Sequence, residues 1–182
     1  MGTRGLIAVY DQKGDHKIAQ YFQFDGYPSG QGKDVLAFLH DEEKVCMLKT
    51  YRLKGCRFLT QAQIDKINLE KNPIEQRPQL SRNLGADILN LAATVDTLAL
   101  VDSLDFAADS LFCEWAYVIS FKDNVFEVYK GFNTNPATGR FADLPTEPGS
   151  EYRPVTLIKS YALDDLPSYE QFIKDCDPED AP

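Results

Sequence analysis

Two pairs of strand-like segments, each joined by a short polar turn, place the strongest limit on how this chain can fold. The first pair is Leu6–Tyr10 and Ile18–Phe24, and the second is Phe112–Phe121 and Val125–Phe132. These segments are rich in apolar, β-branched and aromatic residues, which favour strands, and the turns between them are short enough for hairpins. We therefore expect two antiparallel hairpins, with Val155–Tyr161 as a last strand.

Apolar residues recur at helical spacing outside these hairpins. The expected helices are one from Gly32 to about His40, one opened by the capping box of Thr60 and Gln63, one through Leu84 to Leu91 with Ser81 or Asn83 near its start, and a terminal one from Pro167 to Ile173. Residues 71–78 and 133–154 are predicted to be loops. Residues 44–59 are ambiguous, and residues 99–101 fit either a short strand or a continued helix.

Strands near both ends of the chain, with helices between them, predict an α+β fold. Its sheet should be antiparallel and built mainly from hairpins, with several helices packed on it. The length of 182 residues fits a single globular domain covering residues 1–182.

Charge is unevenly distributed along the chain, whose net charge is −9. Residues 1–86 carry 13 Lys and Arg against 10 Asp and Glu, whereas residues 87–182 carry 6 against 18. An acidic half repels phosphate backbones, so direct binding of nucleic acid is disfavoured. The acidic half, which includes an expected acidic tail at residues 175–182, fits a solvated surface. Alternatively, it fits a decoy of nucleic acid for a host DNA-binding protein.

Several classes of protein are disfavoured by what the sequence lacks. No apolar segment approaches the roughly 18 residues of a membrane-spanning helix, and the N-terminus does not have the pattern of a secretory signal. We therefore expect a cytoplasmic protein that does not contact a membrane. The four cysteines are far apart and the two histidines do not cluster with them, so we expect neither a metal site nor a cofactor.

The segment from Asp25 to Gly32, with the sequence DGYPSGQG, is the best candidate for a binding site because it precedes the first expected helix. Backbone N–H groups at such a helix start can hold an anion, and an arginine on the neighbouring strand would add positive charge. The candidate ligand-binding residues are Arg4, Asp25, Tyr27, Ser29, Gly30 and Gly32.

A purely structural interpretation of the same segment is also open. The glycines would then serve a tight turn, Ser29 would cap the helix, and Arg4 and Asp25 would form a cross-strand ion pair. The segment differs from a phosphate-binding loop of the Walker type, because Lys33 is followed by Asp34 where that motif places a hydroxyl.

The sequence assigns no catalytic residue, so whether the chain is an enzyme is left open. Ser29 has no histidine near it in the sequence to act as a base. One enzymatic alternative is an amide hydrolase with an N-terminal nucleophile, for which Thr3 is the candidate. Removal of Met1 would expose Gly2 instead of Thr3, which weakens this alternative.

Four longer segments carry a family resemblance: Gly2–Gly5 (GTRG), Gln20–Gly32 (QYFQFDGYPSGQG), Glu114–Ile119 (EWAYVI) and Phe126–Gly131 (FEVYKG). On these segments the chain resembles a group of uncharacterised bacteriophage and prophage proteins. The resemblance implies an origin but no activity. The combined expectation is a phage or prophage accessory protein that binds a host protein or a small anionic ligand.

Overall fold

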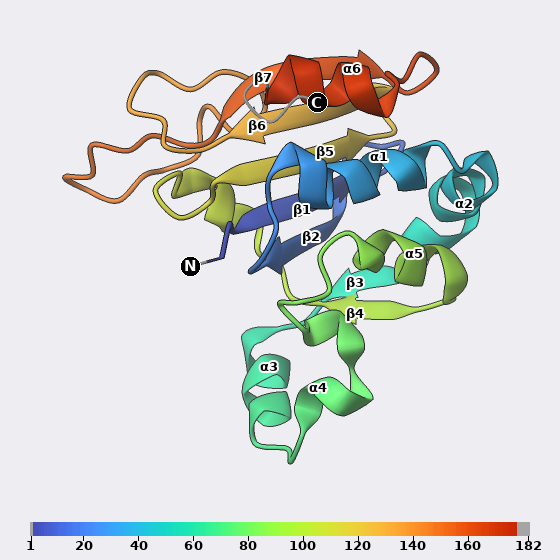
Figure 1. Cartoon of the computed structure of the whole chain (residues 1–182). Coiled ribbons are helices and arrows are strands. Elements are labelled where there is room, and N and C mark those ends of the chain that lie inside the picture. Colours follow the sequence, from blue (N-terminus) through green and yellow to red (C-terminus); the bar gives the residue numbers. More distant parts are fainter. Residues whose placement is uncertain (1, 178–182) are drawn as a thin grey trace.

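A five-stranded sheet forms the centre of the protein in the computed structural model, which describes residues 2–177 (Figure 1). In spatial order its strands are β2 (His16–Phe22), β1 (Gly5–Tyr10), β5 (Trp115–Ser120), β6 (Val125–Lys130) and β7 (Thr156–Ala162). Both predicted hairpins are confirmed, because β1 pairs with β2 and β5 with β6 in antiparallel fashion, and β7 is the expected last strand.

The expectation of an antiparallel sheet needs one correction, since β1 and β5 lie parallel in the centre of the sheet. Parallel neighbours cannot be joined by a tight turn and need a long crossover connection. Here the crossover is the whole segment between β2 and β5, which contains helices α1 to α5 and a separate two-stranded parallel sheet. The mixed sheet with its helices confirms the α+β fold class.

The remaining elements have the following bounds. The helices are α1 (Lys33–Leu39), α2 (Glu42–Met47), α3 (Gln61–Asn68), α4 (Pro73–Gln76), α5 (Asp87–Thr94) and α6 (Tyr169–Cys176). The small sheet consists of β3 (Cys56–Phe58) and β4 (Leu98–Leu100). Short helical turns of other types are η1 (Pro28–Gly32), η2 (Leu48–Arg52), η3 (Leu53–Gly55), η4 (Pro78–Leu80) and η5 (Leu104–Ala108).

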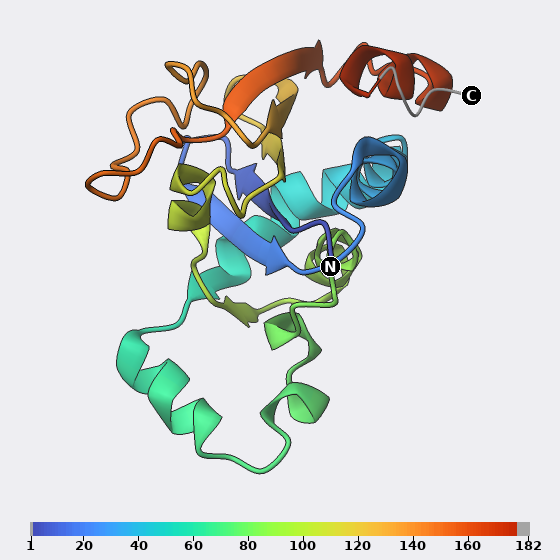
Figure 2. The same cartoon turned by 60° about the vertical axis from the view of Figure 1, so that its left-hand side comes forward.

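The two faces of the large sheet are covered by different parts of the chain (Figure 2). Because side chains alternate along a strand, Ile7 and Val9 of β1 pack with α1, α5 and α6, whereas Leu6 and Ala8 point to the other face. That second face is covered by η5 and by the irregular segment 131–155, which supplies Phe141. Both faces of β1 and β5 are therefore buried, as expected for the central pair of a covered sheet.

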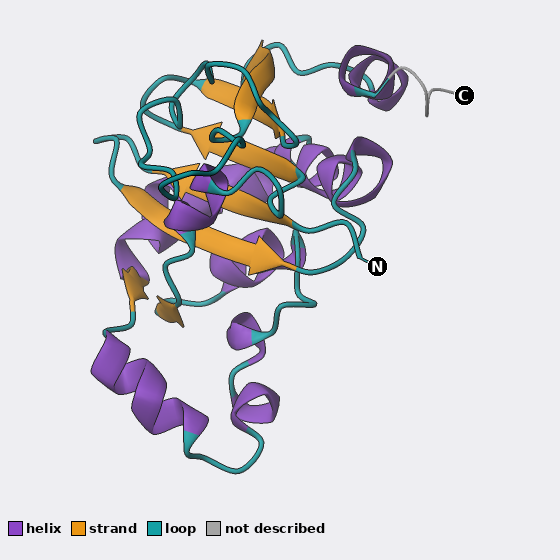
Figure 3. Cartoon of the chain, turned by 90° about the vertical axis from the view of Figure 1, so that its left-hand side faces the viewer, coloured by secondary structure: helices purple, strands orange, loops and turns teal. Residues whose placement is uncertain are grey.

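Helices α3 and α4 form an arm that extends away from the body (Figures 1 and 3). Neither helix buries a residue, and Leu69 at the end of α3 is 88% exposed. The predicted capping box is confirmed, since the Thr60 hydroxyl accepts the Gln63 N–H while the Gln63 side chain accepts the Thr60 N–H. Since α3 buries no residue, packing contributes little to its stability, and the cap stabilises the helix locally.

Several expected boundaries were wrong. Residues 71–78 were expected to be a loop but contain α4, and α5 begins after Ala86 without a cap from Ser81 or Asn83. Pro167 is not the first residue of the terminal helix, because Ser168 caps α6 by accepting the Gln171 N–H. Residues 44–59, ambiguous in the sequence, contain α2, η2, η3 and β3.

The acidic tail expected at residues 175–182 overlaps the terminal helix. Asp175 and Cys176 belong to α6, where Asp175 lies 2.8 Å from the Lys159 ammonium and Cys176 is buried. Positions 178–182 lie outside the described residues.

Candidate functional site

The segment that contains the candidate site residues is attached to the body at three points. The Gly26 N–H donates to the Thr3 carbonyl at 2.9 Å, and the buried Tyr117 hydroxyl donates to the Gly26 carbonyl at 2.7 Å. The Gln31 side chain accepts the Ala86 N–H at 2.7 Å, directly before α5. These bonds attach the segment to the residues just before β1, to β5 and to the residue before α5, so the fold fixes its conformation.

Asp25 and Tyr27 lie together, as the sequence suggested. The Tyr27 hydroxyl donates to the Asp25 carboxylate at 3.2 Å, and both side chains are exposed. Asp25 has a φ of 57°, a left-handed conformation that Asp and Asn tolerate better than most residues. This conformation lets the Asp25 carbonyl accept the Gln31 N–H at 2.8 Å. The turn therefore presents one carboxylate and one phenol to solvent.

The glycines of this segment serve close approaches of the backbone. A side chain at Gly30 would collide with the Asp25 carbonyl, and one at Gly32 would lie 2.8 Å from the Tyr117 hydroxyl oxygen. The N–H groups of Gly30 and Gly32 donate to the Tyr27 carbonyl at 3.0 and 3.4 Å. An anion would have to displace these bonds. Ser29, which precedes Gly30 in η1, is half-buried.

Arg4 is engaged with the start of β5. Its N–H donates to the Glu114 carboxylate at 3.2 Å, and its carbonyl accepts the Glu114 N–H at 3.1 Å. The guanidinium carbon lies 4.6 Å from the centre of the Phe112 ring, a cation–π geometry. Its Nε is buried without a hydrogen-bond partner. Within residues 2–177 the cross-strand ion pair between Arg4 and Asp25 is not formed.

Three exposed phenylalanines lie at the same end of the large sheet as Arg4. Phe24 follows β2, Phe112 precedes β5 and Phe132 follows β6, and their exposed fractions are 49%, 43% and 56%. The strand register places them at the same end of the sheet, because Gly5 pairs with Phe22 and with Trp115, which pairs with Lys130. We call Arg4, Phe24, Tyr27, Phe112 and Phe132 the aromatic end of the sheet.

The sequence interpretation missed these phenylalanines because it placed each of them inside a strand. Phe24, Phe112 and Phe132 were terminal residues of expected strands, but the observed strands end or begin two or three residues away from them. An aromatic residue in a half-buried strand is ordinary core, whereas the same residue beyond the strand is exposed. The pattern of alternating aromatic residues along the second hairpin is typical of a half-buried sheet, and five of these residues are buried: Trp115, Tyr117, Phe121, Phe126 and Tyr129.

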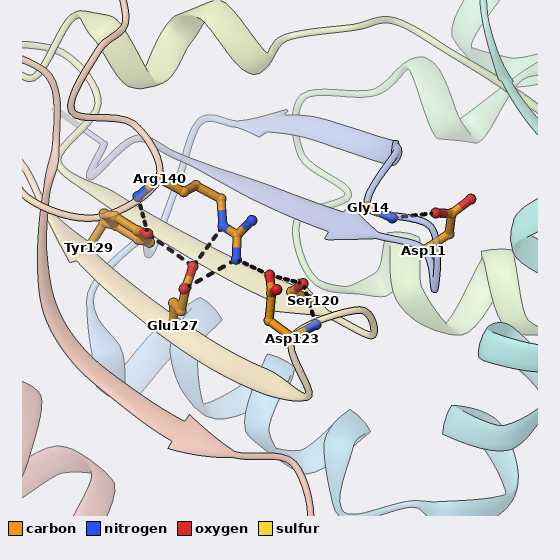
Figure 4. Close-up of polar contacts among 7 residues, drawn as sticks. All are labelled: Asp11, Gly14, Ser120, Asp123, Glu127, Tyr129 and Arg140. Atoms are coloured by element: carbon orange, nitrogen blue, oxygen red, sulfur yellow. Dashed lines mark hydrogen bonds and ion pairs between the residues drawn. The ribbon is translucent and has the colours of Figure 1, made fainter.

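A second polar cluster lies on the sheet face covered by segment 131–155 (Figure 4). The Arg140 side chain donates to Glu127 at 2.8 Å and to Asp123 at 3.0 Å, and the Tyr129 hydroxyl donates to Glu127 at 2.9 Å. Burial raises the pKa of Tyr129, and the carboxylate of Glu127 raises it further. These charges are paired with one another. The cluster therefore attaches the irregular segment to the sheet, and its charged groups are poorly placed to bind a ligand or to react.

The three buried thiols do not form a reactive site, whereas Cys46 is exposed. Cys56, Cys113 and Cys176 are buried, and burial raises the pKa of Cys56 to about 11 and that of Cys176 to about 11. Such thiols stay protonated at neutral pH and are poor nucleophiles. Nowhere in residues 2–177 do three or more Cys, His, Asp or Glu side chains gather in a way that would hold a metal ion.

Comparisons with known proteins add no further identification. No protein-family model matches the chain, and neither a curated protein nor a solved structure is similar to it. Among residues 2–177, no helix combines the length and the apolar composition that crossing a membrane requires.

Proposed function

We propose that this chain is a binding protein that takes hold of a segment of a partner protein at the aromatic end of its sheet. The observation that carries the proposal is that three exposed phenylalanines, one of them stacked against an arginine, lie at the same end of four neighbouring strands. Aromatic residues and arginine are enriched at the centres of protein interfaces, where they contribute most of the binding energy.

The backbone at Phe132 supports a role for its side chain. Its φ of 51° lies in the left-handed region, which costs a residue other than glycine roughly 1–2 kcal/mol. Glycine would remove that cost, yet the position carries a phenylalanine that is 56% exposed. Backbone strain of this kind is concentrated at functional sites. We therefore assign Phe132 the role of an apolar anchor for the partner.

The dimensions and charge of the aromatic end define the partner. Neighbouring strands are about 4.8 Å apart, so the distance from β2 to β6 is about 14 Å, the length of roughly four extended residues. The Arg4 guanidinium, half-buried against Phe112, suits a carboxylate of the partner. The expected partner segment is short, apolar and acidic.

A protein segment is favoured over a small anion as the ligand of this end. The amides of Gly30 and Gly32 already donate to Tyr27, so they do not form an open anion cradle. The proposal keeps the expectation that the chain is a phage or prophage accessory protein acting on a host protein, which rests on the resemblance alone.

The test is selection of a displayed random peptide library on the immobilised protein, followed by affinity measurements on individual peptides. Phe132→Ser and Arg4→Ala should each weaken the selected peptides at least ten-fold. The matched control is Tyr51→Ser, which removes an aromatic side chain that is 53% exposed on η2, elsewhere on the molecule. Its effect should stay within two-fold, and equal losses in all three variants would refute the proposal.

A further inference from the structure

A lysine-rich cavity lies between the β1–β2 turn and the helical turns η2 and η3, at the opposite end of the sheet from the aromatic end. Its volume is about 290 Å³. We propose that it binds a compact multivalent anion that carries phosphate groups. This inference does not depend on the proposed function, because it concerns other residues and another ligand. The cavity is lined by Asp11, Gln12, Lys13, Asp15, Lys17, Lys49, Thr50, Leu53 and Lys54.

The positive charge around the cavity is only partly neutralised. Lys17 lies 3.6 Å from Asp11 and 3.7 Å from Asp15. Within residues 2–177, no carboxylate lies within ion-pair distance of Lys13, Lys49 or Lys54. The four ammonium groups and two carboxylates leave a net charge of +2 around a space that is large enough for a ligand.

Asp11 is an ionised carboxylate that caps the turn beside the cavity. One carboxylate oxygen accepts the N–H groups of Lys13 at 2.8 Å, Gly14 at 3.0 Å and Asp15 at 3.0 Å (Figure 4 draws the bond to Gly14). Burial opposes ionisation, but these N–H bonds and Lys17 outweigh it and lower the pKa of Asp11. The Asp11 carboxylate thus fixes the backbone of the turn that carries Lys13.

A fifth lysine approaches the same turn from the β5–β6 hairpin. The side chain of Lys122 is so close to Gly14 that a Cβ there would lie 2.8 Å from the Lys122 Cδ and 3.2 Å from its Nζ. Gly14 has a φ of 93°, which a larger residue would adopt only with strain. Two separate connections of the sheet therefore bring lysines to the same turn, although Lys122 is not among the residues that line the cavity. The positive charge of Lys122 adds to the attraction of this turn for an anion.

The size and surroundings of the cavity indicate a compact ligand. A space of 290 Å³ admits a few phosphate groups or a small phosphorylated molecule. A long polyanion would also meet the acidic half of the chain, where residues 87–182 carry 18 Asp and Glu against 6 Lys and Arg. That repulsion favours a small phosphate compound over a nucleic acid.

The experiment is isothermal titration of the full chain with tripolyphosphate at low salt. We expect saturable binding with one site per chain. The double variant Lys49→Gln with Lys54→Gln should bind at least ten-fold more weakly, because each ammonium group offers charge-assisted hydrogen bonds to phosphate oxygens. The matched control is Lys66→Gln with Lys71→Gln on the arm, which lowers the net charge equally away from the cavity.

The outcomes separate the possible ligands. Loss of affinity in the cavity variant, with a control within two-fold of the unmodified protein, supports the site. In that case, tighter binding of adenosine diphosphate than of pyrophosphate shows that an organic group of the ligand is also recognised, and equal binding identifies a site for phosphate alone. Absence of saturable binding, equal losses in both variants, or tighter binding of a short DNA duplex through the same lysines would overturn the inference.

Discussion

Replacing Tyr117 by phenylalanine tests how the candidate segment is held in place. The Tyr117 hydroxyl donates to the Gly26 carbonyl at 2.7 Å, and both residues are buried. Burial raises the pKa of Tyr117 well above its usual value, so the hydroxyl stays protonated and acts as a donor at neutral pH. Phenylalanine keeps the ring and removes only this donor.

The expected cost follows from the burial of the acceptor. A buried carbonyl that loses its donor costs roughly 1–3 kcal/mol, more than the net value of an exposed hydrogen bond. For a chain of this length each kcal/mol lowers the melting temperature by roughly 2–4 °C, so a central value of about 2 kcal/mol corresponds to about 4–8 °C. The change should be local, because the ring of Tyr117 still fills its place beside Gly32.

Differential scanning calorimetry of Tyr117→Phe measures this cost directly. The control is Tyr51→Phe, where the tyrosine is 53% exposed and the change should shift the melting temperature by less than about 1 °C. Amide hydrogen exchange in residues 26–32 should also accelerate in Tyr117→Phe, since this segment loses an attachment point. A melting temperature within 1 °C of the unmodified protein would refute the reasoning.

Three further predictions concern other parts of the molecule. Arg140→Met should destabilise the protein by about 2 kcal/mol, measured by urea unfolding, because it leaves the largely buried Glu127 without its cation; an unchanged midpoint would contradict this. Thr60→Ala should cost about 1 kcal/mol locally, so amide exchange in α3 should accelerate about five-fold while the global melting temperature changes little. The hydrogen bond from Lys159 lowers the pKa of Asp175 in the folded protein. The stability that Asp175 contributes should therefore be complete above the unfolded-state pKa of about 3.9. It should be lost as the pH falls through the lower pKa of the folded state. Melting curves of Asp175→Asn and the unmodified protein should therefore differ near pH 6 and converge in strong acid, and a constant difference would show that the carboxylate charge is not involved.

The proposed partner site and the proposed phosphate site occupy opposite ends of the same strands. Gly5 and Phe22 lie near the aromatic end, whereas Tyr10 and His16 lead into the lysine-lined turn. Strands β1 and β5 join the two ends through a core that is buried on both faces. A variant at one end should therefore leave binding at the other end unchanged unless it unfolds the sheet, which makes each site a control for the other.

The sequence by itself determined the local structure wherever the signal is local. Turn length and strand-forming residues defined both hairpins, and the Thr60 and Gln63 pair defined the start of α3, because each of these interactions joins residues that are close in the chain. The turn at Asp25–Gly32 before α1 could also be predicted from the sequence, since glycine, proline and aspartate each favour specific backbone angles.

Only the tertiary structure decided how these pieces combine. The parallel pairing of β1 with β5 joins residues more than a hundred positions apart, and nothing local in either strand specifies that neighbour. The same long-range pairing determines where the strands end, and so whether Phe24, Phe112 and Phe132 are buried in the sheet or exposed beyond it. The lysines of the cavity come from η2, η3, the β1–β2 turn and β2, so their common charge exists only once the crossover has packed against the hairpin. Both candidate sites depend on contacts between distant segments, and such contacts are set by burial of the whole core, which no single segment encodes.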